Sequence, residues 1–215
     1  MINALFETIY MSFTSLLLSW VIAMPLGSIV SETRPGGLFP NRIINFILNR
    51  IVDLGRAIPF ILLVVFLFPF TRMLIGTAIG TKAMVVPLTI CAIPFEIRLI
   101  EEILSEVPYS IIEAAKIDGA SNLKIIIRIK WACKTPYLVN ALGITLINII
   151  GYSAMAGVVG GGGLGNYAIV YGFQRFNWSI IAQSVVLVVL LVSTIQIINN
   201  ILVRILLRRI LCVRH

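Results

Sequence analysis

The chain has 215 residues, of which 59% are hydrophobic and 12% are charged, with a formal net charge of +8 and a mean hydropathy of +1.03. Soluble domains average about 45–50% apolar and about 25% charged residues, and a soluble globule of this length would leave the excess apolar surface in water. The composition therefore excludes an ordinary soluble enzyme, a disordered chain and a disulfide scaffold. It favours a protein whose solvent is largely lipid.

Apolar runs recur along the whole chain, but the third, residues 83–95, completes a membrane crossing only with the amphipathic residues 97–103. A helix needs about 20 mostly apolar residues to cross the hydrocarbon core. The second run reaches that length only if it extends back through Asp53, which we expect to pair with Arg50 and Arg56 at the interface. No basic segment precedes the first run, so we expect a permanent span rather than a signal peptide. The sequence predicts an all-α polytopic membrane protein with a single domain over residues 1–215 and five transmembrane helices over residues 8–31, 50–71, 82–103, 137–159 and 176–203.

The placement of the basic residues predicts the orientation of these helices. Lys and Arg concentrate on the cytoplasmic side of membrane proteins. All of the 17 basic residues except Arg72, Lys82 and Arg175 lie on one side of the predicted five-helix topology. We therefore expect the N-terminus outside and the C-terminus in the cytoplasm. Because the positive charge follows the topology, we expect no nucleic-acid partner.

Cysteine and histidine are too sparse to suggest metal or redox chemistry. Cys91, Cys133 and Cys212 form no C-x-x-C motif, and we expect them to pack as small apolar side chains. The single histidine is the terminal His215. The sequence therefore predicts no metal site and no catalytic residues.

The polar segment 104–136 predicts a helix–turn–helix hairpin on the cytoplasmic side. Ser110 and Glu113 have the spacing of a capping box at the start of a first helix. Ile111, Ile112 and Ala115 give that helix an apolar face.

A turn and a second helix complete the predicted hairpin. Gly119 ends the first helix because glycine accepts a positive φ, and Ser121 can cap the second helix. Lys124 and Arg128 share one face of that helix at the i,i+4 spacing. Another, broad face is formed by Leu123, Ile126, Ile127 and Lys130. An apolar and basic hairpin at this position either lies on anionic lipid or docks into another protein, and composition leaves both possibilities open.

The residues Glu113-Ala114-Ala115, with Gly119 four residues after the last alanine, resemble the EAA loop of ABC importer permeases. Further blocks, in the same order along the chain, are similar to the permease subunit of methionine importers: residues 56–61, 69–72, 86–89, 151–155, 162–165 and 171–172. The loop indicates the importer family, and the blocks indicate the methionine subfamily.

This resemblance implies a type I ABC importer permease fold in the inner membrane, working by alternating access. It implies a homodimer with two cytoplasmic ATP-binding subunits and an extracytoplasmic solute-binding protein. ATP and Mg would be bound by the ATP-binding subunits, and this chain would need no cofactor. The hairpin would be the coupling loop, contacting the ATPase through Ile112, Glu113, Ala114, Ala115, Gly119, Lys124, Ile126 and Arg128.

A substrate pathway is predicted near the end of the fourth span. Methionine is a zwitterion with a flexible thioether, and a suitable site has soft apolar walls, an aromatic ring and a few polar groups. Tyr152, Ser153 and Met155 match that chemistry, and the resemblance places this block beside the central pathway. Packing between helices is the alternative role for the same residues.

The chain carries no nucleotide-binding motif that fits its predicted context. The run from Gly76 to Lys82 has the wrong spacing for a Walker A loop. Gly160, Gly162 and Gly165 match G-x-G-x-x-G but follow a membrane helix rather than a strand. We expect these glycines to end the helix and to let backbones approach closely.

Charged residues inside the predicted spans are scarce, and this bears on the source of energy. Asp53 and Glu96 are expected near cytoplasmic helix ends, which leaves no buried ion relay of the kind that proton- or sodium-driven carriers use. Energy supplied by a partner is therefore the simpler hypothesis. An ABC permease for another small solute, and a channel or secondary transporter whose hairpin lies on lipid, remain as alternatives.

Overall fold

The structure is a computed structural model that describes residues 1–212, with side chains described as far as Arg208. The expectations for Arg214 and His215 fall outside the described residues, and that for Cys212 concerns a side chain outside the described set. Residues 1–212 form helices and no strand, which confirms the all-α prediction.

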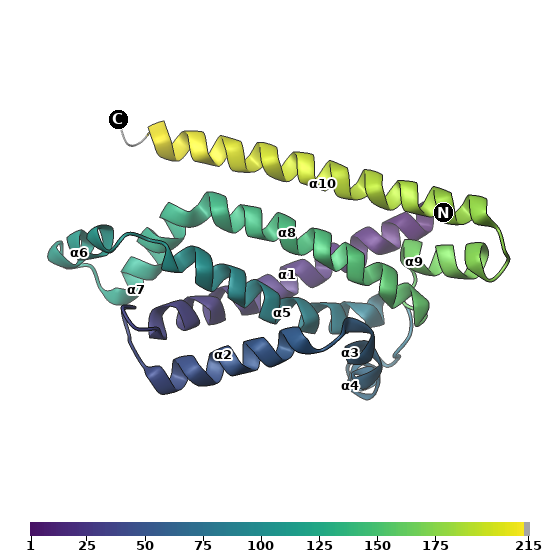
Figure 1. Cartoon of the computed structure of the whole chain (residues 1–215), viewed down its shortest axis with the longest axis horizontal. Coiled ribbons are helices and arrows are strands. Elements are labelled where there is room, and N and C mark those ends of the chain that lie inside the picture. The colour runs from purple at the N-terminus through teal and green to yellow at the C-terminus, as the bar shows by residue number, and fades with distance from the viewer. Residues whose placement is uncertain (213–215) are drawn as a thin grey trace.

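Four helices in the described part of the chain are long and apolar enough to cross a membrane. They lie roughly side by side along the longest axis of the molecule (Figure 1). Four of the five predicted spans correspond to them, namely α1 (Ile2–Thr33), α5 (Thr81–Ser105), α8 (Trp131–Val158) and α10 (Trp178–Cys212).

The predicted second span, 50–71, is wrong as a single helix. The segment is divided into α2 (Arg42–Ala57), α3 (Phe60–Phe66) and α4 (Phe68–Ile75). The break lies at Ile58, which adopts an extended conformation (φ −77°, ψ 122°) because the following Pro59 disfavours the helical region. The crossing expected here is therefore interrupted between α2 and α3.

The ion pair predicted for Asp53 is also absent. Asp53 is exposed on α2, and within the described residues no Lys or Arg nitrogen lies within 4.0 Å of its carboxylate. Arg50 is directed elsewhere, with its guanidinium 5.1 Å from the centre of the Phe46 ring. A cation over an aromatic face is favourable at an exposed site, and it replaces the expected pair.

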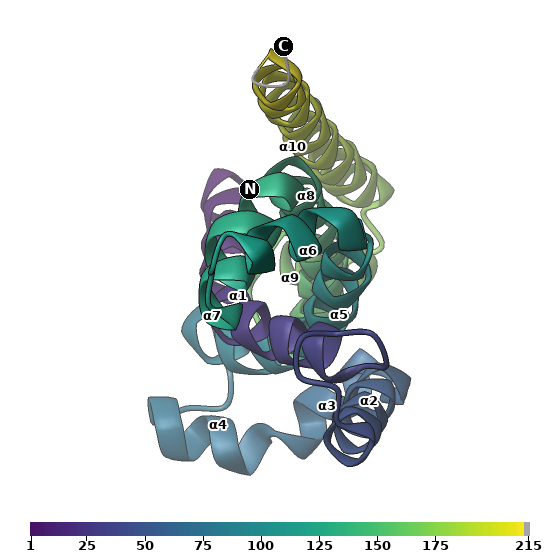
Figure 2. The ribbon, with the colours of Figure 1, turned by 90° about the vertical axis from the view of Figure 1, so that its left-hand side faces the viewer.

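The core of the molecule lies where α1, α5 and α8 meet. α1 packs most extensively against α5, and α8 packs against both. Met11, Met84, Leu88, Ile149 and Ile150 are almost completely buried there. α10 is the peripheral helix, seen in Figure 2 extending away from the others, and most of its apolar side chains are exposed. A helix that is apolar and exposed suits a lipid environment.

A polar seam runs through the contact between α1 and α5. Glu96 is fully buried there and accepts a hydrogen bond from the Ser19 hydroxyl at 2.9 Å, while the Ser15 hydroxyl donates to the Val85 carbonyl at 3.2 Å. Glu96 was expected near a helix end, but it lies inside the bundle. Serine spacing of three to four residues along α1 makes this seam possible, because such residues share a helix face.

The two ends of the bundle differ in character. The segments predicted to be cytoplasmic, including the polar hairpin and the C-terminal end, gather at one end in Figure 1, and the N-terminus lies at the other. At the N-terminal end, the Gly80 amide donates to the Gly160 carbonyl at 3.0 Å. The segments predicted to be cytoplasmic therefore lie at the opposite end of the bundle from the N-terminus, as the predicted topology requires.

Candidate functional site

The predicted hairpin is present. Its first helix is α6 (Tyr109–Ile117) and its second begins as α7 (Asn122–Lys124), which continues through the π-helical segment η1 (Ile125–Lys130) into α8. Figure 1 shows it projecting from the end of the bundle that carries the C-terminus. The second helix of the hairpin and the fourth predicted span therefore belong to one continuous helix.

The turn of the hairpin has the predicted chemistry. Gly119 has φ +76°, and the Ala120 amide donates to the Ala115 carbonyl at 2.9 Å, closing the end of α6. The Ser121 hydroxyl accepts a hydrogen bond from the Lys124 amide at 3.4 Å. The turn predicted at Gly119 and the helix cap predicted at Ser121 are confirmed.

The predicted capping box of Ser110 and Glu113 is wrong. α6 begins at Tyr109 after Pro108, and no side chain caps it. Proline has a fixed φ and is favoured at a helix start, so the helix begins before Ser110 can act as its cap. Ser110 and Glu113 are both exposed.

Ile112 and Ala115 pack in the interior of the hairpin. Each is less than 9% exposed, and they pack with Val107 and the fully buried Ile125 in a small core inside the hairpin. Two short helices need such a core to stay together. Ile126 is partly buried and lines a pocket of about 460 Å³ against the end of α1. These three side chains therefore pack against other parts of this chain, and their role in docking stays a prediction.

The outer surface of the hairpin carries the remaining predicted residues. Glu113, Ala114, Gly119, Lys124 and Arg128 are all exposed. Four exposed apolar side chains accompany them, of which the sequence had indicated only Ile111 and Leu123: Tyr109, Ile111, Ile117 and Leu123. Ile117 is 81% exposed. An exposed surface of mixed apolar and charged groups is typical of a protein-binding site.

A buried ion pair joins the hairpin to α1. The Lys130 ammonium donates to the Glu32 carboxylate, and both residues are at most 3% exposed. Glu32 also accepts from the Leu38 amide at 3.1 Å, and next to this pair the Trp131 indole donates to the Ser28 hydroxyl at 3.1 Å. Sequence analysis missed this pair, because it assigned Lys130 only to the charge pattern of the topology and a broad helix face.

Two further contacts tie the base of the hairpin to the bundle. The Lys134 ammonium lies 3.0 Å from the Glu106 carboxylate, which is largely exposed. The Arg34 guanidinium donates to the Ser105 carbonyl at 2.7 Å. These contacts therefore hold together the ends of α1, α5 and α8 from which the hairpin projects.

The three residues predicted to line a substrate pathway do not converge. Tyr152 stacks on Phe60 of α3, with ring centroids 5.1 Å apart. Ser153 is buried and its hydroxyl donates to the Ile150 carbonyl at 2.7 Å. Met155 is 50% exposed. Because neighbouring residues on a helix point in different directions, only Met155 lies on the uncovered face of α8.

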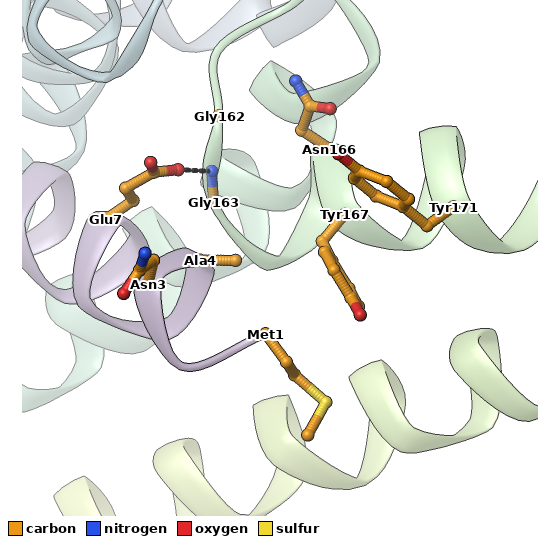
Figure 3. A pocket seen from close by; sticks show the side chains of 9 residues that line it. All are labelled: Met1, Asn3, Ala4, Glu7, Gly162, Gly163, Asn166, Tyr167 and Tyr171. Carbon is orange, nitrogen blue, oxygen red and sulfur yellow. Dashed lines mark hydrogen bonds between the residues drawn. The ribbon is translucent and has the colours of Figure 1, made fainter.

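A pocket of about 370 Å³ lies at the opposite end of the bundle (Figure 3). It is formed by the start of α1, by α9 (Gly163–Tyr167) and by the π-helical segment η2 (Ala168–Phe173) that follows α9. The Glu7 carboxylate accepts from the Gly163 amide at 2.7 Å. This contact stabilises the start of the short helix that the glycine run produces.

The glycine run has the predicted structural role. Gly160 and Gly162 have positive φ, and they follow the end of α8. At Gly157 an added Cβ would lie 2.2 Å from the backbone nitrogen of Asn166. The close approach of α8 and α9 therefore depends on the absence of a side chain.

Neither cysteine with a described environment belongs to a metal-ligand cluster. Cys91 is partly buried, whereas Cys133 is exposed, so the packing role predicted for Cys133 is wrong. Among the residues that the structure describes, no three His, Cys, Asp or Glu side chains form a potential metal site.

Comparison with known proteins identifies the family. Residues 23–211 match the family of the binding-protein-dependent transport system inner membrane component. The chain is 44% identical over 204 residues to the probable D-methionine transport system permease protein MetI of Vibrio cholerae, covering 95% of this chain and 91% of that protein. It is 41% identical over 157 residues to the D-methionine transport system permease protein MetI of Escherichia coli K12, covering 73% of this chain and 72% of that protein.

Solved structures agree with this assignment. A native crystal form showing inward-facing conformations of the MetNI methionine ABC transporter superposes with a TM-score of 0.93 at 40% identity, covering 95% of each chain. An amino acid ABC transporter crystallised with histidines has a TM-score of 0.75 at 16% identity, covering 94% of this chain and 92% of that one, and so shares the fold. The chain therefore belongs to the family of binding-protein-dependent inner membrane components, the multi-pass permease subunits of ABC importers.

Proposed function

We propose that this chain is the membrane-spanning permease of an ATP-driven importer for methionine. The observation that carries the proposal is the exposed hairpin with the Glu113-Ala114-Ala115 motif, within a chain 44% identical to a probable D-methionine permease. The fold superposes on a methionine ABC transporter. The sequence identity and the superposition both extend over 95% of this chain, so they support the proposal independently of the short motif.

The outer surface of the hairpin is the proposed docking site for a separate ATP-binding subunit. Ile117 and Leu123 would enter an apolar cleft of that subunit, and the exposed Glu113, Lys124 and Arg128 would form polar contacts around it. Gly119 would keep the apex of the hairpin narrow. ATP and Mg would be bound by the partner, and this chain would contribute no ATPase site.

Two copies of this chain would form one pathway around a two-fold axis. The exposed face of α8, with Gly151, Met155 and Val158, is uncovered in a single copy and would line or border that pathway. A partner of the same kind would cover apolar surface that neither copy covers alone. An extracytoplasmic solute-binding protein would deliver substrate at the bundle end that holds Glu7. In this orientation the N-terminus would lie outside the inner membrane and the hairpin would lie on its cytoplasmic side.

Reconstitution into proteoliposomes tests this proposal. The permease is inserted with and without its ATP-binding subunit, and uptake of labelled methionine is measured with ATP, without ATP, and with a non-hydrolysable analogue. We expect uptake only when the subunit, the solute-binding protein and hydrolysable ATP are all present.

Two results would contradict different parts of the proposal. Uptake that needs neither ATP nor the subunit would indicate a channel or secondary carrier. ATP-driven uptake of another amino acid, with none of methionine, would keep the importer and reject its proposed substrate.

A further inference from the structure

The most deeply buried charged groups at the hairpin end are Glu32 and Lys130. They lie 98 residues apart in sequence, on α1 and on the last residue of η1, and their side chains are in direct contact. Burying two charges is costly unless the pair is close and its remaining polar atoms are satisfied. Glu32 meets that condition, since its second oxygen accepts from the Leu38 amide.

The contact lies where the helix is irregular. Residues 125–130 form a π-helical segment, and the Trp131 amide donates to the Ile126 carbonyl, five residues earlier. π-helical segments lack the regular spacing of an α-helix and often occur at functional sites. Lys130 therefore attaches α1 to the point at which the hairpin passes into the long α8 helix.

Neighbouring contacts make the attachment to α1 broad. Trp131 bonds to Ser28, one turn before Glu32, and the Phe39 amide donates to the Glu32 carbonyl at 3.0 Å. The end of α1, the loop after it and the base of the hairpin thus share one hydrogen-bonded cluster. Lys134 and Glu106 also form an ion pair nearby, but that carboxylate is largely exposed.

We infer that the Glu32–Lys130 pair transmits hairpin movement to α1, so that the coupling of ATP hydrolysis to transport depends on it. This inference rests on the proposed importer function, in which it makes Glu32 and Lys130 positioning residues. Without the pair, the hairpin would still contact α1 through the Trp131–Ser28 hydrogen bond, but it could tilt with less movement of α1. With the pair intact, α1 and the α5 helix packed on it follow the hairpin as one body.

The test compares three double variants in the full complex with the ATP-binding subunit and the solute-binding protein. Glu32→Gln/Lys130→Met removes both charges, so that no single charge is left buried without a partner. Glu32→Lys/Lys130→Glu reverses the pair. Glu106→Gln/Lys134→Met is the matched control, because it removes a pair whose carboxylate is largely exposed at the same end of the bundle. ATP hydrolysis and methionine uptake are measured on the same proteoliposomes.

We expect the neutral variant to assemble and to hydrolyse ATP within about twofold of wild type, while methionine taken up per ATP falls about tenfold. The reversed pair should recover part of that ratio, and the control should match wild type. A neutral variant with the wild-type ratio, or one that no longer assembles with the ATPase, would overturn the inference. A reversed pair without any recovery would overturn the role of the charges. Absence of ATP-driven uptake by the wild-type complex would instead reject the proposed function.

Discussion

Gly119 is the residue at the apex of the hairpin, with a left-handed φ of +76° and open space where a Cβ would lie. A side chain here would therefore lower the free energy of unfolding through the strained backbone conformation rather than through a clash. For an alanine this loss is about 1–2 kcal/mol. A large side chain adds a second effect, because it projects from the surface that is proposed to enter the ATPase.

Gly119→Arg should leave the protein inserted in the membrane but abolish ATP-driven uptake. Glu113→Lys, which reverses an exposed charge beside the same surface, should act in the same direction. Gly119→Ala is the control, and we expect it to retain most of the uptake at slightly lower thermal stability. Membrane yield and uptake are the two measurements. Normal ATP-driven uptake in both Gly119→Arg and Glu113→Lys would contradict the coupling role.

Met155 and Ser153 should respond differently to truncation, since one is exposed and the other buried. Met155→Ala should alter methionine uptake or substrate-stimulated ATPase activity without lowering the expressed amount, because its side chain lies on the uncovered face of α8. Ser153→Ala should leave uptake unchanged and cost about 1 kcal/mol of stability through the lost bond to Ile150. If Met155→Ala transports like wild type, its proposed position beside the pathway is wrong.

At the scale of elements, the hairpin is a small structure with its own core. Ile125 is fully buried between α6 and η1, whereas Ile117 is 81% exposed on the same hairpin. Substitutions at these two isoleucines therefore test the folding of the hairpin and its docking separately.

Ile125→Ala should destabilise the hairpin by about 2–5 kcal/mol, because it leaves a cavity in a core of few residues. Ile117→Ala should leave stability unchanged and weaken retention of the ATP-binding subunit during purification. Hydrogen exchange over residues 109–125 and co-purification measure the two effects. Unchanged retention in Ile117→Ala would remove this residue from the docking surface.

Local signals predicted much of the fold because they act within a few residues. Long uncharged runs indicated α1, α8 and α10, and a shorter run extended by an amphipathic segment indicated α5. Gly119 and Ser121 indicated the turn. Pro59 was a visible signal for the break after α2, but the apolar composition of 57–71 favoured a continuous helix in the sequence analysis.

Contacts between distant segments could not be predicted in this way. Nothing near Glu32 in the sequence indicates that Lys130, 98 residues later, is its partner. The same holds for Glu96, whose burial depends on where Ser19 of α1 lies. For the candidate site, sequence identified the hairpin and its exposed charged residues, but only the packing showed that Ile112 and Ala115 face inward.

At the scale of the whole molecule, the single chain leaves large apolar surfaces uncovered. α10 has most of its apolar residues exposed, and α8 exposes Met155 and Val158. Lipid and a second copy of the chain together account for these surfaces. The hairpin, at the end of the bundle, remains free for a different kind of partner (Figure 1).

The most direct test of the central claim is a photo-crosslinking measurement on the assembled complex. A photo-reactive amino acid replaces Ile117 on the hairpin, and the control carries it at Leu190, an exposed position on α10. The account predicts a crosslink from position 117 to the ATP-binding subunit and none from position 190. Crosslinks from position 117 to lipid alone, in a complex that hydrolyses ATP and imports methionine, would contradict it.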